Sequence, residues 1–144
     1  MPVLILSEVE DFHIPFVARH LSEPPLIIDT KGIIDIAVKL TYEFDGNQLH
    51  IIHNGKKLSN VTGVWHRRPI VLDRHLHLPI PEQYQEYSAS AIKRFMHTLY
   101  CCFPEALWVS DYFAIQRAEN KPYQQMVAAN VGFHVPKTTY TTDS

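Results

Sequence analysis

An unbroken apolar run, Val3 to Leu6, limits the fold of this chain more than any other segment does. Successive side chains of a strand point to opposite faces of its sheet, so a strand that is apolar throughout has to be covered on both faces. Such strands are typical of the middle of a parallel sheet. The run has no basic segment before it and is followed directly by acidic residues, which indicates a buried strand instead of a signal peptide.

A predicted helix and a second strand follow. Asp11 is placed to cap a helix over residues 12–22. The side chains expected to face inward are Phe12, Phe16, Val17, Ala18 and Leu21. Pro24 and Pro25 end this helix, and the run from Leu26 to Asp29 predicts the second strand.

The hydrophobic period then changes to two. Apolar and polar residues alternate from Ile36 to Phe44, which predicts a half-buried strand. Asp45-Gly46 predicts a hairpin turn, Leu49 to His53 the return strand, and Asn54-Gly55 a second turn of the same kind. We therefore expect a small antiparallel ribbon at one edge of the main sheet.

Further strands and helices alternate to the end of the chain. Val61 to Trp65 predicts a strand, Glu82 to Phe103 a long helix with apolar residues three and four apart, and Leu107 to Val109 a short strand. This order predicts an α/β fold that is Rossmann-like, with a mostly parallel sheet, helices on both faces and a small antiparallel hairpin insertion.

The last quarter of the chain predicts a helix over about residues 117–131 that Gly132 ends, followed by an extended segment from Val135 to Thr141. Nothing after this segment is available to pair with it. We therefore expect the chain to be the front part of a larger protein, with a frayed tail after Gly132.

Composition excludes several classes of function. The length of 144 residues fits one domain, and 46% hydrophobic with 19% charged residues is ordinary for a globular protein. The net charge of −2 offers no electrostatic footprint for nucleic acid, and no apolar run is long enough to cross a membrane. Cys101 and Cys102 are adjacent and poorly placed to bridge each other, so we expect small core residues in a reduced, cytoplasmic compartment.

Arg67 and Arg68 follow the predicted strand that ends near Trp65. Open α/β sheets place their ligands at the carboxyl ends of strands, and two guanidinium groups there can clamp a carboxylate or phosphate. The alternative is a solvated basic turn that pairs with nearby acids. The chain has neither a GxGxxG nor a GxxxxGK[ST] loop, and no serine lies in a GxSxG context.

Two other groups of residues are candidates for ligand sites. Lys121 lies in the first turn of the last helix, where a lysine and free backbone N–H groups suit a phosphate; the alternative is an exposed surface lysine. Asp73, His75 and His77 alternate and resemble half of a metal site, but no second cluster completes it. We therefore expect no metal site in this chain.

Taken together, several motifs resemble one family. They are Val64-Trp65-His66-Arg67-Arg68-Pro69, Trp108 in a strand, Ala118-Glu119-Asn120-Lys121, Gln125, and Gly132-Phe133-His134-Val135-Pro136-Lys137-Thr138. This set is similar to the N-terminal region of ATP-grasp peptide ligases, in particular the MvdD-like group that matures microviridins and other graspetides. The resemblance covers residues 4–142.

The resemblance implies a pre-ATP-grasp domain over residues 1–116 and the start of an ATP-grasp region over residues 117–144. Complete enzymes of this kind use ATP and Mg²⁺ to activate a side-chain carboxylate of a precursor peptide as an acyl phosphate. A hydroxyl or amine then attacks, which closes an ester or amide macrocycle. By the same resemblance, Lys121 approaches an ATP phosphate, and Arg67 and Arg68 shape the substrate side of the cleft.

The remaining nucleotide-binding and magnesium-binding groups of that family lie beyond Ser144. Phosphoryl transfer needs metal ions and charge clamps around the phosphates. We therefore expect no catalytic residue and no bound cofactor in this chain, and no ATP turnover by the chain alone. The alternative function is a stand-alone α/β module that binds a peptide or acidic ligand, or forms a homodimer through the helix over residues 82–103.

Overall fold

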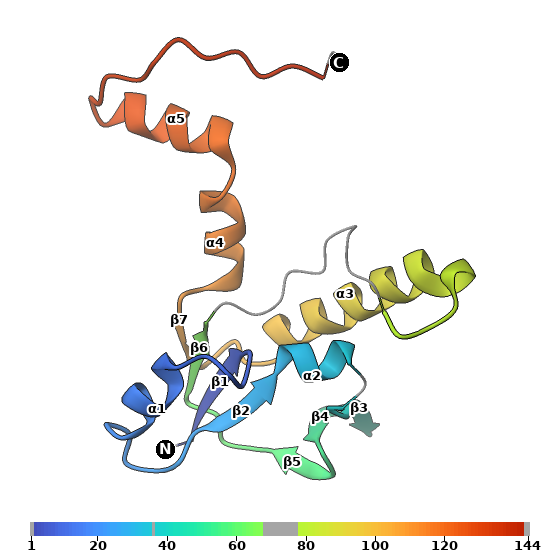
Figure 1. Cartoon of the computed structure of the whole chain (residues 1–144). Coiled ribbons are helices and arrows are strands. Elements are labelled where there is room, and N and C mark those ends of the chain that lie inside the picture. The colour runs from blue at the N-terminus through green and yellow to red at the C-terminus, as the bar shows by residue number, and fades with distance from the viewer. Residues whose placement is uncertain (1, 36, 68–77, 143–144) are drawn as a thin grey trace. The chain divides into compact units, whose positions relative to one another are not determined.

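The computed structural model of the chain describes residues 2–35, 37–67 and 78–142. It divides into two compact units, Met1–Val109 and Ser110–Ser144. The predicted α/β class is confirmed: a parallel sheet, a separate antiparallel sheet and helices alternate along the chain (Figure 1).

The parallel sheet of the first unit has four strands: β1 (Val3–Ser7), β2 (Leu26–Asp29), β6 (Gly63–His66) and β7 (Leu107–Val109). Their order is β2-β1-β6-β7, and every neighbouring pair is parallel. Residues 4–6 of β1 are fully buried, each with 0% exposure. The predicted central strand is therefore confirmed, because β1 is paired at both edges and covered on both faces.

The first helix, α1 (His13–Ala18), is shorter than predicted, and its expected inward face is wrong in part. Phe12 and Phe16 are 69% and 57% exposed, whereas Ile14 is buried. The helix begins at His13 because Asp11 accepts hydrogen bonds from the N–H groups of His13 and Ile14, and this start sets which residues turn inward. A helix of six residues is too short for the spacing of its apolar residues to show which face is buried.

A second short helix, α2 (Thr30–Ile34), lies where no helix was predicted. Asp29 ends β2 and caps α2 by accepting the N–H of Lys31 at 3.1 Å. Gly32 sits inside the helix because an added Cβ would lie 2.5 Å from Val38 Cγ2 and 2.9 Å from Asp29 Oδ2. A helix-interior glycine lowers helix propensity, which is why sequence reasoning missed this turn.

The predicted hairpins are confirmed in β3 (Leu40–Asp45), β4 (Gln48–His53) and β5 (Lys56–Leu58). The residues with positive φ at their turns are Gly46 (58°), Asn54 (49°) and Gly55 (79°). The strand predicted from residue 36 begins at Leu40, and residue 36 itself lies outside the described residues.

These three strands form a sheet of their own, in the order β3-β4-β5, and do not extend an edge of the parallel sheet. The edge position expected for the ribbon is therefore wrong. The physical reason is that the apolar side chains of the ribbon, Ile51 and Leu58, pack into the same core as the parallel sheet. Burial in the shared core removes this apolar area from water, which favours the observed arrangement.

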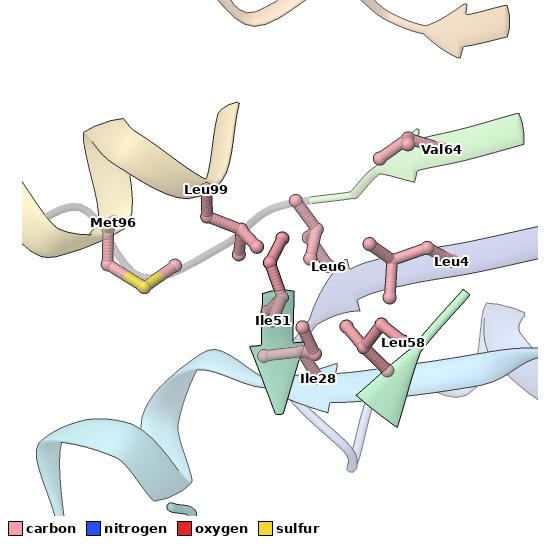
Figure 2. Packing of buried hydrophobic residues seen from close by; sticks show 8 residues of the cluster. All are labelled: Leu4, Leu6, Ile28, Ile51, Leu58, Val64, Met96 and Leu99. Carbon is pink, nitrogen blue, oxygen red and sulfur yellow. The ribbon is translucent and has the colours of Figure 1, made fainter. Parts of the chain in front are cut away.

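One hydrophobic core joins both sheets and the long helix α3 (Gln85–Cys101), as Figure 2 shows. Its buried members are Leu4, Leu6, Ile28 and Val64 from the parallel sheet, Ile51 and Leu58 from the antiparallel sheet, and Met96 and Leu99 from α3. Burial of each such side chain contributes roughly 1.5–3 kcal/mol, so this cluster stabilises the whole first unit.

The predicted long helix is confirmed as α3, preceded by a short 3-10 turn, η1 (Glu82–Tyr84). The buried residues of α3, Met96 and Leu99, lie in its C-terminal half, whereas Tyr84 and Tyr87 are 53% and 78% exposed. In the buried half, the Tyr42 hydroxyl donates to the Phe95 carbonyl at 3.0 Å, and the two rings lie 4.3 Å apart. Cys101 is exposed, so the expected core position is wrong for this residue.

The second unit contains two helices where one was predicted: α4 (Tyr112–Ala118) and α5 (Lys121–Asn130). Asn120 separates them because its backbone is extended, with φ −70° and ψ 108°, and its side chain accepts the N–H of Tyr123 at 3.0 Å. Asp111 caps α4 in the same way through the N–H of Ala114.

The end of α5 follows the prediction. Gly132 has φ 89°, its N–H donates to Ala129 O at 3.0 Å, and the N–H of Phe133 donates to Ala128 O at 2.9 Å. This pair of bonds is the Schellman ending that a glycine permits. The segment after it forms no strand within the described residues, although Gln125 Nε2 donates to Thr138 Oγ1 at 3.0 Å.

No helix within residues 2–35, 37–67 and 78–142 has the length and apolar character needed to cross a membrane.

Candidate functional site

The carboxyl edge of the parallel sheet brings together side chains that are distant in sequence. Ser7 ends β1 and pairs in register with Asp29 of β2, and Leu6 pairs with His66 of β6. Arg67 follows directly, and its N–H donates to the Leu6 carbonyl at 2.9 Å. Open α/β sheets bind ligands at this edge, so we take it as the candidate site.

Three side chains of this edge form a hydrogen-bonded cluster, the Asp11–His13–Arg67 cluster. Arg67 Nε donates to Asp11 Oδ2 at 3.1 Å, and Arg67 Nη2 lies 3.0 Å from His13 Nδ1. His13 Nδ1 lies 2.8 Å from Asp11 Oδ1. The side chains of Asp11, Arg67 and His13 are 11%, 23% and 42% exposed. The cluster ties the loop after β1 to the end of β6.

Asp11 is the anionic centre of this cluster. Its pKa lies below the ordinary value, chiefly because the backbone N–H of His13 donates to the carboxylate at 2.9 Å. The His13 ring and the Arg67 guanidinium act in the same direction, while burial opposes them. The carboxylate is therefore charged at neutral pH and holds the guanidinium in place.

The cluster includes Arg67, one of the two arginines predicted to clamp a ligand. Arg67 pairs with Asp11 through Nε and approaches His13 through Nη2, as the alternative interpretation of a basic turn describes. Within the described residues, its guanidinium is thus engaged by Asp11 and His13. Arg68 lies outside the described residues, and the substrate-binding role of both arginines stays a prediction.

The neighbouring strand end adds two further polar groups. Ser7 is fully buried, and its hydroxyl has no hydrogen-bond partner within the described parts of the chain. Asp29 is engaged as the cap of α2. Behind this edge, the His66 ring meets the Tyr100 ring edge-on at 5.2 Å, so His66 faces the α3 side of the sheet. The edge thus combines the buried Ser7 hydroxyl with the partly exposed side chains of the Asp11–His13–Arg67 cluster.

Lys121 is the first residue of α5, in the position that the sequence predicted. Its ammonium group donates to Gln124 Oε1 at 3.2 Å, and the residue is exposed. Asn120 and Lys121 thus lie together at the start of the helix. The phosphate-binding role of Lys121 stays a prediction.

The described residues contain neither a metal-binding group nor an activated Cys102 thiol. The candidates Asp73, His75 and His77 lie outside the described residues, and elsewhere no group of three or more His, Cys, Asp or Glu side chains is arranged to hold a metal ion. Burial raises the pKa of the Cys102 thiol. A raised pKa lowers the thiolate fraction at neutral pH, so Cys102 is a poor nucleophile.

Sequence reasoning missed Asp11 and His13 as members of the site. Asp11 was predicted only as a helix cap, whereas the N-cap residue of α1 is Phe12, and His13 was not singled out. The available signal was their position: both follow the carboxyl end of the central strand within a few residues, where loops of parallel sheets carry function.

Among the comparisons with known proteins, only solved structures match this chain. No protein-family model matches the chain. No curated protein matches it in sequence. Among solved structures, the macrocyclase MdnC of Microcystis aeruginosa MRC, bound with the precursor peptide MdnA, matches 99% of this chain with a TM-score of 0.80 and 22% identity. The macrocyclase MdnB of the same organism matches 94% with a TM-score of 0.75 and 23% identity.

A third match is the ATP-grasp ligase PsnB, complexed with a phosphomimetic variant of a minimal precursor, Mg and ADP. It covers 98% of this chain with a TM-score of 0.66 and 15% identity. The chain spans about half the length of these three proteins: 48% of MdnC, 46% of MdnB and 48% of PsnB. The predicted resemblance to ATP-grasp peptide ligases is thus confirmed for the fold: this chain is built like the part of those enzymes that it covers.

Proposed function

We propose that this chain is the pre-ATP-grasp part of an ATP-dependent ligase that joins a carboxylate to an amine or hydroxyl on a ribosomal precursor peptide. The observation that carries the proposal is the match over 99% of the chain to a macrocyclase solved with its precursor peptide. The proposed compartment is the cytoplasm. The product is a macrocyclic peptide of the graspetide kind.

In this proposal, residues 1–116 form the pre-ATP-grasp domain and residues 117–144 begin the ATP-grasp region. Lys121 faces an ATP phosphate in the complete enzyme, which supplies the rest of the ATP and Mg²⁺ site. Arg67 and Arg68 line the substrate side. The crystals of PsnB with Mg and ADP support the choice of cofactors. The chain by itself does not turn over ATP.

The test compares the chain with a longer protein made from whatever coding sequence follows residue 144. We expect calorimetry to detect no ATP·Mg²⁺ binding by the chain alone. The longer protein should convert a co-encoded precursor peptide in an ATP-dependent reaction that removes one water per bond formed, as mass spectrometry measures. Lys121→Ala should weaken ATP binding by the longer protein, whereas Lys56→Ala, at an exposed lysine of β5 in the first unit, serves as the matched control.

Either of two results contradicts the proposal. One is tight ATP binding with turnover by the chain alone. The other is a stop codon after residue 144 with no ATP-grasp protein encoded nearby.

A homodimer through α3 is the second candidate. The exposure of Tyr84 and Tyr87, 53% and 78%, favours it because two aromatic side chains on one end of a helix offer apolar area to a second copy. Light scattering at two concentrations should show a dimer that Tyr87→Ala weakens. A strict monomer at both concentrations removes this candidate.

A further inference from the structure

One glutamine joins the two helices of the second unit. Gln124, in the first turn of α5, donates from Nε2 to the carbonyl oxygen of Ala118, the last residue of α4. The last carbonyl groups of a helix have no partner within that helix, and this bond satisfies one of them. The same bond fixes which way the side-chain amide of Gln124 points, because its nitrogen has to face the end of α4.

The oxygen of the same amide holds Lys121. Lys121 Nζ donates to Gln124 Oε1 at 3.2 Å, and residues three apart lie side by side on the surface of a helix. Because the Ala118 carbonyl already holds the amide nitrogen, Gln124 loses little further rotamer freedom when its oxygen accepts from the ammonium group. An ammonium group has three N–H donors, and this contact uses one of them.

The group that holds Lys121 is neutral. Among the described residues, the ion pairs are those of Asp11 with His13 and Arg67, and Lys121 belongs to neither. A carboxylate in place of the Gln124 amide would also hold the ammonium group, but its negative charge would offset the attraction of Lys121 for an anion. A neutral acceptor instead fixes the lysine and leaves its positive charge available.

We propose that Gln124 is a positioning residue for Lys121: it holds the ammonium group at the start of α5, beside the end of α4, ready for an anionic ligand. That the anion is an ATP phosphate rests on the proposed function, whereas the positioning itself does not. A long side chain that is ordered before binding loses less entropy when the ligand arrives. Gln124 therefore raises the affinity for the anion without touching it.

Carbon-13 NMR relaxation of the whole chain tests the positioning without ATP. The Cε–H bonds of Lys121 should have a higher order parameter than those of Lys56, an exposed lysine of β5. Gln124→Met keeps the length of the side chain but removes the amide, so it should lower the Lys121 value to that of Lys56. Gln116→Met, a matched change at an exposed glutamine of α4, should leave the Lys121 value unchanged. A Lys121 side chain as mobile as Lys56 in the unaltered chain overturns the proposal, whether or not the variants fold.

A double-mutant cycle in the longer protein tests the consequence for ATP. Gln124→Met should weaken ATP·Mg²⁺ binding, measured by calorimetry, by about two- to tenfold. In a Lys121→Ala background the same change should have no further effect, because Gln124 acts through Lys121. Equal weakening in both backgrounds would show a merely structural role and overturns the proposal. If Lys121→Ala itself leaves ATP binding unchanged, the proposed function of Lys121 fails, and the relaxation measurement still decides whether Gln124 positions it.

Discussion

The two units of this chain obtain their structure in different ways. In the first unit, eight buried apolar side chains from two sheets and α3 form one core. In the second, the described residues of α4 and α5 include no buried side chain. What defines these helices is local: the Asp111 and Asn120 caps and the glycine ending at Gly132.

The comparison shows that local signals are enough to set where a helix begins and ends, but not enough to stabilise it. Helices of seven and ten residues are marginal in water unless an apolar face is buried. Met126, Val131 and Phe133 are 53%, 66% and 70% exposed. The first unit therefore contributes the cooperative stability of this chain, and the second contributes little of it.

The largest effect is expected from a substitution that disrupts the core of the first unit. Leu99→Ala removes a fully buried side chain of α3 and should destabilise the fold by about 2–5 kcal/mol. Urea unfolding followed by tryptophan fluorescence measures the change. Val127→Ala in α5 is the matched control, with an expected change below about 0.5 kcal/mol. Equal effects of the two substitutions would show that the units unfold together.

A glycine in each unit provides the next contrast. Gly32→Ala should cost about 1–3 kcal/mol of global stability, since its Cβ would meet Val38 and Asp29. Gly132→Ala has open space but a φ of 89°, so its cost of about 1–2 kcal/mol should fall on the end of α5 alone. Urea unfolding measures the loss of global stability, and amide hydrogen exchange measures the local loss at the end of α5. A global loss of stability from Gly132→Ala would contradict the separation.

Removal of a cap should have a smaller and local effect. Asn120→Ala removes the side chain that accepts the Tyr123 N–H at 3.0 Å and should cost α5 about 1 kcal/mol. Faster amide exchange in the first turn of α5, with an unchanged urea midpoint of the first unit, is the expected result. Asn120→Asp keeps the acceptor and should retain most of the protection.

The smallest expected effect concerns the Asp11–His13–Arg67 cluster. The pKa of Asp11 is lowered in the folded state from its ordinary value of 3.8, so the ionised carboxylate stabilises the fold. This contribution is complete above the unfolded-state pKa and is lost as the pH falls through the lower folded-state pKa. Asp11→Asn should therefore reduce the drop in urea midpoint between about pH 6 and about pH 3. Asp45→Asn, at the exposed end of β3, serves as the control. A pH dependence unaffected by Asp11→Asn would exclude this role.

Several elements were predictable because their signals are local or complete within a few residues. The apolar run over residues 3–6 predicted a strand that is buried on both faces, and β1 is that strand. The Asn54-Gly55 pair predicted a tight hairpin turn, and both residues have positive φ. Lys121 was placed correctly in the first turn of the last helix.

Other features were missed, two because they depend on where a short helix begins and one because it depends on a distant contact. The phase of α1 is set by its start at His13, and Phe12 and Phe16 turn outward as a result. The two separate helices in the second unit follow from the extended backbone of Asn120. Asp11 and Arg67 are 56 residues apart, so no sequence window reveals that they pair.

The sequence by itself determined the α/β class, the central strand, the hairpin turns and the position of Arg67 after a strand end. These follow from hydrophobic period and from the backbone preferences of Gly, Asn and Pro, which act over a few residues. Only the tertiary structure decided that the antiparallel strands form their own sheet on the shared core and that Asp11 and His13 engage Arg67. The reason is that parallel strands bring separate loops to one edge, and which side chains meet there depends on register and packing.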